Sequence, residues 1–207
     1  MLETSKFNAR GTRRVRSYVG GLLGAGAFLF EFMKRPATVG SVCPSGAALT
    51  RRLLGGISKE DDGLVVDLGA GPGSVSARML RSGIAKERII AIEAISDFRG
   101  LFAARCPGVR FVVADARELK KVLDREAPGR KISAIVSSLP FRVLGTRLSA
   151  NILRETHMVL RERGGVLIQY SYALWLKYPL RDNGFVPLSA SVVWVNMPPA
   201  RVELYKP

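Results

Sequence analysis

The sequence is short of the residues that define several common protein classes. Its two cysteines, Cys43 and Cys106, have neither the spacing of a metal site nor the pattern of a disulfide framework. A reducing cytoplasm is therefore the expected setting. The single histidine, His157, falls in the middle of an expected helix, which favours a structural role over a catalytic one.

Long hydrophobic runs, internal repeats and low-complexity tracts are also missing. The longest charge-free stretch near the start, Ser17–Phe30, has 14 residues, whereas a membrane-spanning helix needs about 20. No cleavage-site pattern follows it, so a signal peptide is not expected either. A chain of 207 residues, 47% of them hydrophobic, fits one domain with a full-sized core.

Acidic residues are scarce relative to basic ones. There are 17 Asp and Glu against 32 Lys and Arg, which gives a formal charge of +15 and a pI near 10.6. A field of that sign attracts polyanions, either nucleic acid or the anionic face of a membrane.

Much of this charge lies near the start, where residues 6–22 show a helical period. Phe7, Val15, Tyr18, Val19 and Leu22 share one arc, and the opposite arc holds Lys6, Arg10, Arg13, Arg14 and Arg16. This pattern predicts a basic amphipathic helix on an anionic membrane surface, where each basic residue contributes about 1 kcal/mol. The alternatives are a helix that packs on its own domain, or a contact with RNA. We expect residues 1–46 to bind the membrane and cover the active site, ahead of a domain at 47–207.

From residue 64 onward, strand and helix patterns alternate. Expected strands are Leu64–Leu68, Arg88–Glu93, Arg110–Ala114, Ile132–Ser137 and Val166–Tyr170, and expected helices are Ala47–Leu54, Ser74–Leu80, Ile95–Arg105, Leu119–Arg125 and Thr146–Arg161. The alternation predicts an α/β fold with a parallel sheet covered on both faces. Two final strand-like runs, Ser189–Asn196 and Arg201–Tyr205, predict an antiparallel hairpin at the end of the sheet.

Four strand ends carry groups that suit a ligand site. The first strand breaks into a turn with glycines at 69, 71 and 73; Glu93 ends the second, Asp115 follows the third, and Ser137–Phe141 ends the fourth. In an open α/β sheet the ligand lies beyond these carboxyl ends, and glycine permits close backbone approach. A dinucleotide-binding domain shares the first two features, but the third acid and the terminal hairpin fit it poorly.

These four motifs resemble those of class I S-adenosylmethionine-dependent methyltransferases. The resemblance implies a Rossmann-like sheet of seven strands in the order 3-2-1-4-5-7-6, with strand 7 antiparallel. It also implies S-adenosylmethionine as cofactor, with the glycine turn at its amino-acid portion, Glu93 at its ribose and Asp115 at its adenine. The expected cofactor contacts are Ser45, Asp67, Gly69, Ala70, Gly71, Glu93, Ala94, Asp115, Ala116 and Ser137.

Phe28–Ser45, the S-S-L-P-F motif and the closing N-M-P-P-A-R-V at Asn196–Val202 are similar to bacterial phospholipid N-methyltransferases. Those enzymes methylate phosphatidylethanolamine towards phosphatidylcholine. The alternative is a ribosomal RNA adenine methyltransferase, whose N-L-P-Y loop the fourth motif also resembles. Here Ser138 replaces its Asn and Phe141 its Tyr, which disfavours RNA. A cofactor-binding module without catalysis is disfavoured because the fourth motif is retained.

The implied reaction is direct displacement by an amine nitrogen, for which a dedicated base is optional. The groups expected to orient the amine are the Leu139 and Pro140 carbonyls, the Phe141 ring and Tyr18, with Ser138 lining the channel to the methyl group. Arg142 and Tyr172 are expected to bind the substrate. Arg142 is the candidate for a lipid phosphate; its alternative is a solvated loop position. We expect a monomer without a metal, attached peripherally to the inner face of the cell membrane, with phospholipid rather than nucleic acid as partner.

Overall fold

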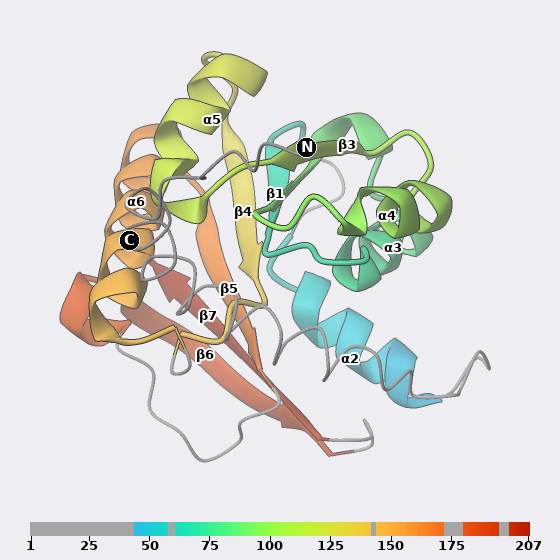
Figure 1. Ribbon diagram of the computed structural model, residues 1–207. Coiled ribbons are helices and arrows are strands. Elements are labelled where there is room, and N and C mark those ends of the chain that lie inside the picture. The colour runs from blue at the N-terminus through green and yellow to red at the C-terminus, as the bar shows by residue number, and fades with distance from the viewer. Residues whose placement is uncertain (1–43, 58–60, 142–143, 172–179, 195–198) are drawn as a thin grey trace, which may run out of the picture. The chain divides into compact units, whose positions relative to one another are not determined.

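The computed structural model describes residues 44–57, 61–141, 144–171, 180–194 and 199–207, which all lie in one compact unit of the chain, residues 41–207. Seven strands form a single sheet in the order β3-β2-β1-β4-β5-β7-β6 (Figure 1). They are β1 (Leu64–Leu68), β2 (Ile89–Glu93), β3 (Arg110–Val113), β4 (Ile132–Ser137), β5 (Val166–Ser171), β6 (Val186–Val193) and β7 (Ala200–Lys206). Strands β1 to β5 are parallel, and β7 is antiparallel to both β5 and β6. This confirms the predicted fold and strand order.

Helices cover both faces of the sheet. On one face α5 (Leu119–Glu126) and α6 (Thr146–Arg163) bury Leu123 and Leu153 against Val66 and Ile135. On the other face lie α2 (Pro44–Leu54), α3 (Ser74–Arg81) and α4 (Phe98–Arg105), whose buried residues include Leu53, Met79 and Phe102. Short 3-10 turns occur at Lys86–Arg88, Ala116–Glu118 and Arg181–Asn183. Strands β1 and β2 are buried along their whole length because helices cover both of their faces.

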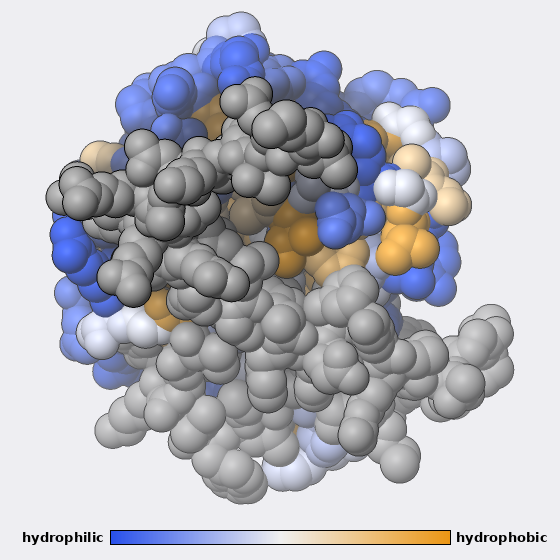
Figure 2. Space-filling model, viewed as in Figure 1, coloured by the Kyte–Doolittle hydropathy of each residue, from blue (hydrophilic) through white to orange (hydrophobic). Residues whose placement is uncertain are grey.

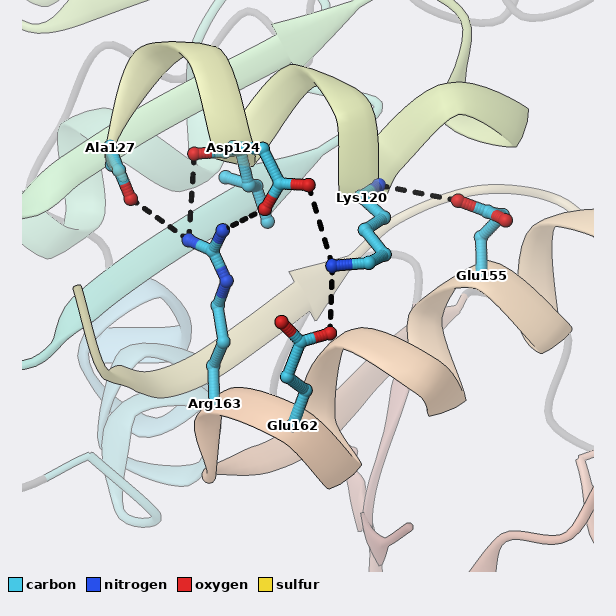
Figure 3. A network of polar contacts seen from close by, with 7 residues as sticks. Lys120, Asp124, Ala127, Glu155, Glu162 and Arg163 are labelled. Carbon is cyan, nitrogen blue, oxygen red and sulfur yellow. Dashed lines mark hydrogen bonds and ion pairs between the residues drawn. The ribbon is translucent and has the colours of Figure 1, made fainter. Parts of the chain in front are cut away.

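A polar network fastens α5 to the last turns of α6 (Figure 3). The guanidinium of Arg163 donates to the Ala127 carbonyl at 2.8 Å and pairs with Asp124. Lys120 bridges Asp124 and Glu162, with its Nζ 3.3 Å and 2.7 Å from their carboxylates. Only 7% of the Arg163 side chain is exposed. The network therefore fixes the position of α5 on the end of α6, and with it the cover over this face of the sheet.

Several element boundaries differ from those expected, and three elements begin three residues away from the expected start. Helix α2 begins at Pro44 instead of Ala47, and the other two are α4 and β6. Helix α4 begins at Phe98, three residues later than Ile95, because the Glu93 carboxylate holds the Ile95 N–H in the preceding turn. Strand β6 begins three residues earlier than expected, at Val186, and its register shifts between Pro187 and Ser189. Proline is tolerated there because β6 is the edge of the sheet and one side of its backbone has no neighbouring strand to bond.

The predictions made for residues 1–43 lie outside the described residues. They include the amphipathic helix and the division of the chain at residue 46. Within the described ranges, no helix is both long and apolar enough to cross a bilayer.

Candidate active site

The turn after β1 can be made only by glycine. Gly69, Gly71 and Gly73 have φ values of 79°, 51° and 88°, which side-chain-bearing residues rarely adopt. A Cβ on Gly69 would lie 2.6 Å from Leu139 Cδ2, and one on Gly73 would lie 2.9 Å from Cys106 Sγ. The turn is therefore packed against the loop after β4 on one side and against the end of α4 on the other.

Asp67 lies beneath this turn and is completely buried. Its Oδ2 accepts hydrogen bonds from Ser76 N at 3.0 Å and Ser76 Oγ at 2.6 Å, so it caps the first turn of α3 from outside the helix. Burial raises the Asp67 pKa to about 6; the Ser76 bonds oppose this rise and the charge of Glu93 adds to it. Its Oδ1 is buried and has no hydrogen-bond partner within the described part of the chain.

Glu93 connects the end of β2 to the same turn. Its Oε2 accepts a hydrogen bond from Gly71 N at 2.9 Å, and its Oε1 accepts one from Ile95 N at 2.9 Å. A carboxylate oxygen can accept more than one bond, so both oxygens keep capacity for ligand hydroxyl groups. Glu93 is thus placed to serve as the predicted ribose acceptor, and it also holds the glycine turn in position.

The adenine site predicted after β3 contains an ion pair. Asp115 accepts a bond from Arg117 N at 2.8 Å and lies 2.6 Å from Arg117 Nη2. Partial burial raises the Asp115 pKa, but the bonds to Arg117 and its charge outweigh that effect, so the pKa lies below its ordinary value. Ala116 is half-buried beside it, and Ala94 is exposed at the end of β2. Ala70 is buried in the core, which leaves its backbone as the part able to meet a ligand.

The loop after β4 is bound directly to the glycine turn. Ser138 Oγ donates to the Gly69 carbonyl at 3.0 Å, and Ser138 N donates to the Leu68 carbonyl at 3.3 Å. Ser137 is buried, and its Oγ accepts a bond from Leu139 N at 3.3 Å. The predicted cofactor site and the predicted substrate loop therefore form one bonded unit.

The carbonyls of this loop differ in the bonds that they already accept. Leu139 O accepts from Phe141 N at 3.0 Å and from Gln169 Nε2 at 3.1 Å, so both of its lone pairs are used. Phe141 O accepts from Ser149 Oγ on α6. Among the described residues, Pro140 O accepts one bond, from Leu144 N at 3.1 Å, which leaves its second lone pair unused there. Of the two carbonyls predicted to orient an amine, that of Pro140 is the better placed.

Phe141 differs from its predicted role. Its ring is 2% exposed and belongs to the core beneath α6. This placement argues against the expected contact between the ring and a substrate amine. The Phe141 backbone holds the loop, because its N–H donates to Leu139 O and its carbonyl accepts from Ser149 Oγ on α6.

Several predicted site residues remain untested. Ser45 lies in the first turn of α2, as expected for a helix start, and its cofactor contact stays a prediction. Outside the described residues lie Tyr18, Arg142 and Tyr172, and the predicted membrane-binding residues Lys6, Arg10, Arg13, Arg14 and Arg16. In the described ranges, no group of three or more His, Cys, Asp or Glu side chains is arranged to hold a metal ion.

Two buried polar groups, on β5 and on β7, were not predicted from the sequence. Gln169 on β5 is 1% exposed and donates to the Leu139 carbonyl. On β7, Glu203 accepts from Arg201 Nη2 at 2.6 Å and from Tyr205 Oη at 3.0 Å. A glutamine inside the apolar run V-L-I-Q-Y was the available signal, because an amide in a strand covered on both faces must find partners.

The predicted cofactor fits these residues. The buried Asp67 Oδ1 beneath the turn is an acceptor without a hydrogen-bond partner in the described part of the chain. Glu93 adds two further acceptor atoms at the adjacent strand end. Such a set suits a ligand that carries an ammonium group and vicinal hydroxyls.

The raised pKa of Asp67 gives a prediction about stability. The folded protein holds this proton more tightly than the unfolded chain does, so the unfolding free energy is lowered as pH rises from about 4 to about 6. A rise from 3.8 to about 6 corresponds to about 3 kcal/mol. In Asp67→Asn this loss should disappear, since the amide oxygen can still accept from Ser76. Between pH 4 and pH 7, the unfolding free energy of the wild type measured in urea should fall by about 3 kcal/mol relative to that of the variant.

The exposed Asp97 provides the matched control, Asp97→Asn, which removes one carboxylate outside the turn. An Asp67→Asn curve that stays parallel to the wild-type curve across this range would contradict the assignment of the raised pKa.

Comparison with known proteins agrees with this site. Residues 65–164 match the family described as "Methyltransferase domain". The ornithine lipid N-methyltransferase of Singulisphaera acidiphila is 26% identical over 176 residues, which cover 84% of this chain and 91% of that protein.

Two solved structures illustrate the fold. The 1,6-didemethyltoxoflavin-N1-methyltransferase of Burkholderia thailandensis, solved with S-adenosylhomocysteine, superposes with a TM-score of 0.62 at 18% identity, over 98% of this chain and 92% of that one. TrmN from Thermus thermophilus superposes with a TM-score of 0.56 at 19% identity. The match covers 80% of this chain and 52% of TrmN, so this chain spans about half the length of TrmN. The sheet order is that of the class I methyltransferase fold, and the domain match together with the glycine turn and its acceptors indicates S-adenosylmethionine as the cofactor of this site.

Proposed function

We propose that the enzyme N-methylates phosphatidylethanolamine and its monomethylated and dimethylated forms at the inner face of the cell membrane. The observation that carries the proposal is the loop after β4, where Pro140 O offers an acceptor next to the glycine turn. An acceptor there suits a substrate that presents N–H groups. The lipid N-methyltransferase that matches 84% of the chain supports an amine-bearing lipid as the substrate class.

The chain's own residues divide the work of this reaction. When bound, S-adenosylmethionine supplies a methyl group on a positively charged sulfur. Glu93 and the glycine turn hold the cofactor side of the site, and Pro140 O accepts an N–H of the amine so that the nitrogen lone pair faces away from the loop. An ordinary amine has a pKa near 10, so deprotonation at pH 7 costs roughly 4 kcal/mol. Positioning can offset that cost, and no residue need act as a dedicated base.

Ornithine lipid is a second candidate substrate, because it is named as the substrate of the relative. It presents an amine to the same acceptor, so the class of reaction is unchanged. Nucleic acid is the competing class, favoured by the charge of +15.

Radiolabelled S-adenosylmethionine distinguishes these candidates. The enzyme should label vesicles that contain phosphatidylethanolamine, and vesicles with ornithine lipid would extend the range. Labelling of ribosomal RNA but of neither lipid would reject the proposal.

Membrane attachment is supported by surface features of the chain. The predicted basic arc lies within residues 6–16, outside the described residues. Strand β6 runs parallel to β5, so Trp194, which follows it and is 62% exposed, lies at the sheet edge where β4 and β5 also end. Tryptophan is favoured at membrane–water interfaces. The coloured surface in Figure 2 is mainly hydrophilic, with hydrophobic residues visible near the centre and at the right of the view.

Glu93 provides a prediction about cofactor affinity. In Glu93→Ala the ligand hydroxyls lose their acceptor and the turn loses its bond to Gly71. Bonds to a charged group contribute roughly 1.5–3 kcal/mol, so the affinity for S-adenosylhomocysteine should fall about 10- to 150-fold in calorimetry. Glu87→Ala, at an exposed position, is the control. Equal affinities for Glu93→Ala and the wild type would refute the assignment.

The amphipathic segment provides a prediction about membrane binding. Changing Arg10, Arg13 and Arg14 to Glu should abolish flotation with anionic vesicles, because the reversed charges are repelled by the headgroups. Wild-type binding should rise with the anionic lipid fraction and fall with salt. Calorimetry with S-adenosylhomocysteine on the same triple variant should show near-normal affinity. If the triple variant floats as well as the wild type, the membrane role is wrong and the alternative applies, a helix that packs on its own domain.

A further inference from the structure

Gln169 lies where the fourth motif begins. It is on β5, in register with Ser137 of β4 on one side and with Glu203 of β7 on the other. Ser137 is in turn in register with Leu68, the residue before the glycine turn. The Gln169 side chain is thus at the same level of the sheet as the turn and the loop that build the candidate active site.

The amide of Gln169 is satisfied on its nitrogen side. Nε2 donates to Leu139 O at 3.1 Å and to Tyr170 O at 3.2 Å. Both partners are carbonyls, so only the nitrogen can face them and the orientation of the amide is fixed. Oε1 therefore points away from both carbonyls. It is buried and has no hydrogen-bond partner among the residues described.

A buried carbonyl oxygen without a donor costs roughly 1–3 kcal/mol and calls for an explanation. Gln169 Oε1 shares a carbon atom with the nitrogen that holds Leu139 O, and Pro140 is the next residue of that loop. The oxygen is therefore a second unsatisfied acceptor on the side chain that holds the loop carrying Pro140. Two acceptors match the two N–H groups of a neutral primary amine, and they leave its lone pair unbonded.

We propose that Gln169 Oε1 accepts a hydrogen bond from the amine of the lipid substrate and so favours the less methylated forms. This inference rests on the proposed function. In the reaction the nitrogen lone pair forms the new N–C bond, and the C–S bond breaks with its electrons remaining on sulfur. In the first two methylations the methylated nitrogen, now positively charged, releases a proton to water; the third gives a quaternary ammonium with no N–H proton to release. Each of the first two cycles removes one N–H, so the contribution of Gln169 decreases from the first methylation to the third.

The number of N–H groups separates this role from a structural one. Gln169→Met keeps the length of the side chain and removes both the donor and the acceptor. It should lower kcat/KM for phosphatidylethanolamine about fivefold more than kcat/KM for the dimethylated lipid. Ser149→Ala is the matched control, because it loosens the same loop by removing the bond to Phe141 O. This control should lower kcat/KM by the same factor for every methylation step.

Two further measurements do not depend on the stability of that variant. Gln169→Glu retains an acceptor oxygen and loses the donor, so it should keep the wild-type preference for the less methylated lipid while all rates fall. With S-adenosylhomocysteine bound, the wild type should bind short-chain phosphatidylethanolamine more tightly than short-chain phosphatidylcholine, which has no N–H. Gln169→Met should reduce this difference.

The outcomes separate the two proposals. If the wild type labels no amine lipid, the proposed function fails, and this inference fails with it. If the wild type labels the lipid but Gln169→Met slows every step equally, as Ser149→Ala does, the inference alone is overturned. Gln169 is then a positioning residue for Leu139.

Discussion

The contact between the loop after β4 and the glycine turn after β1 is the constraint on which the rest of the site depends. Leu139 occupies the space that a side chain on Gly69 would fill, and Ser138 Oγ is bonded to the Gly69 carbonyl. The turn cannot move without moving the loop. A site that must align an amine with a methyl donor needs such a fixed relation, because small errors in position are costly for reactions that rely on proximity.

The two acids beneath the turn differ in the hydrogen bonds that they accept. Asp67 is fully buried, and its raised pKa of about 6 means that its negative charge is poorly stabilised in the folded protein. Glu93 holds two backbone N–H groups instead. A cationic ligand near the buried Asp67 carboxylate would lower its pKa again, because an opposite charge nearby favours the ionised form. Binding of a cationic cofactor would thus relieve the unfavourable burial of the Asp67 charge. Functional sites often contain ionisable groups whose environment is unfavourable before the ligand binds.

The sheet could be predicted closely from the sequence, because a short local pattern of residues marks each inner strand. The apolar runs of β1 and β4 and the glycines behind β1 mark their own boundaries. The predicted start of β6 is three residues too late, because an edge strand with proline and exposed residues lacks the apolar run that marks an inner strand. The occupied lone pairs of Leu139 O and the half-satisfied amide of Gln169 could not be predicted. They depend on hydrogen bonds between residues 30 positions apart.

The burial of Phe141 bears on the choice between a lipid and a nucleic acid. Enzymes that act on a base take it out of the stack and hold it between aromatic or apolar side chains, as well as by hydrogen bonds to its edge. The Phe141 ring is packed into the core beneath α6, and the loop around it presents a carbonyl to the site. An aliphatic amine needs only acceptors that orient its N–H groups, whereas a purine also needs a flat surface. With the Phe141 ring in the core, the described part of the loop offers a substrate a carbonyl acceptor, which agrees with the proposed amine substrate.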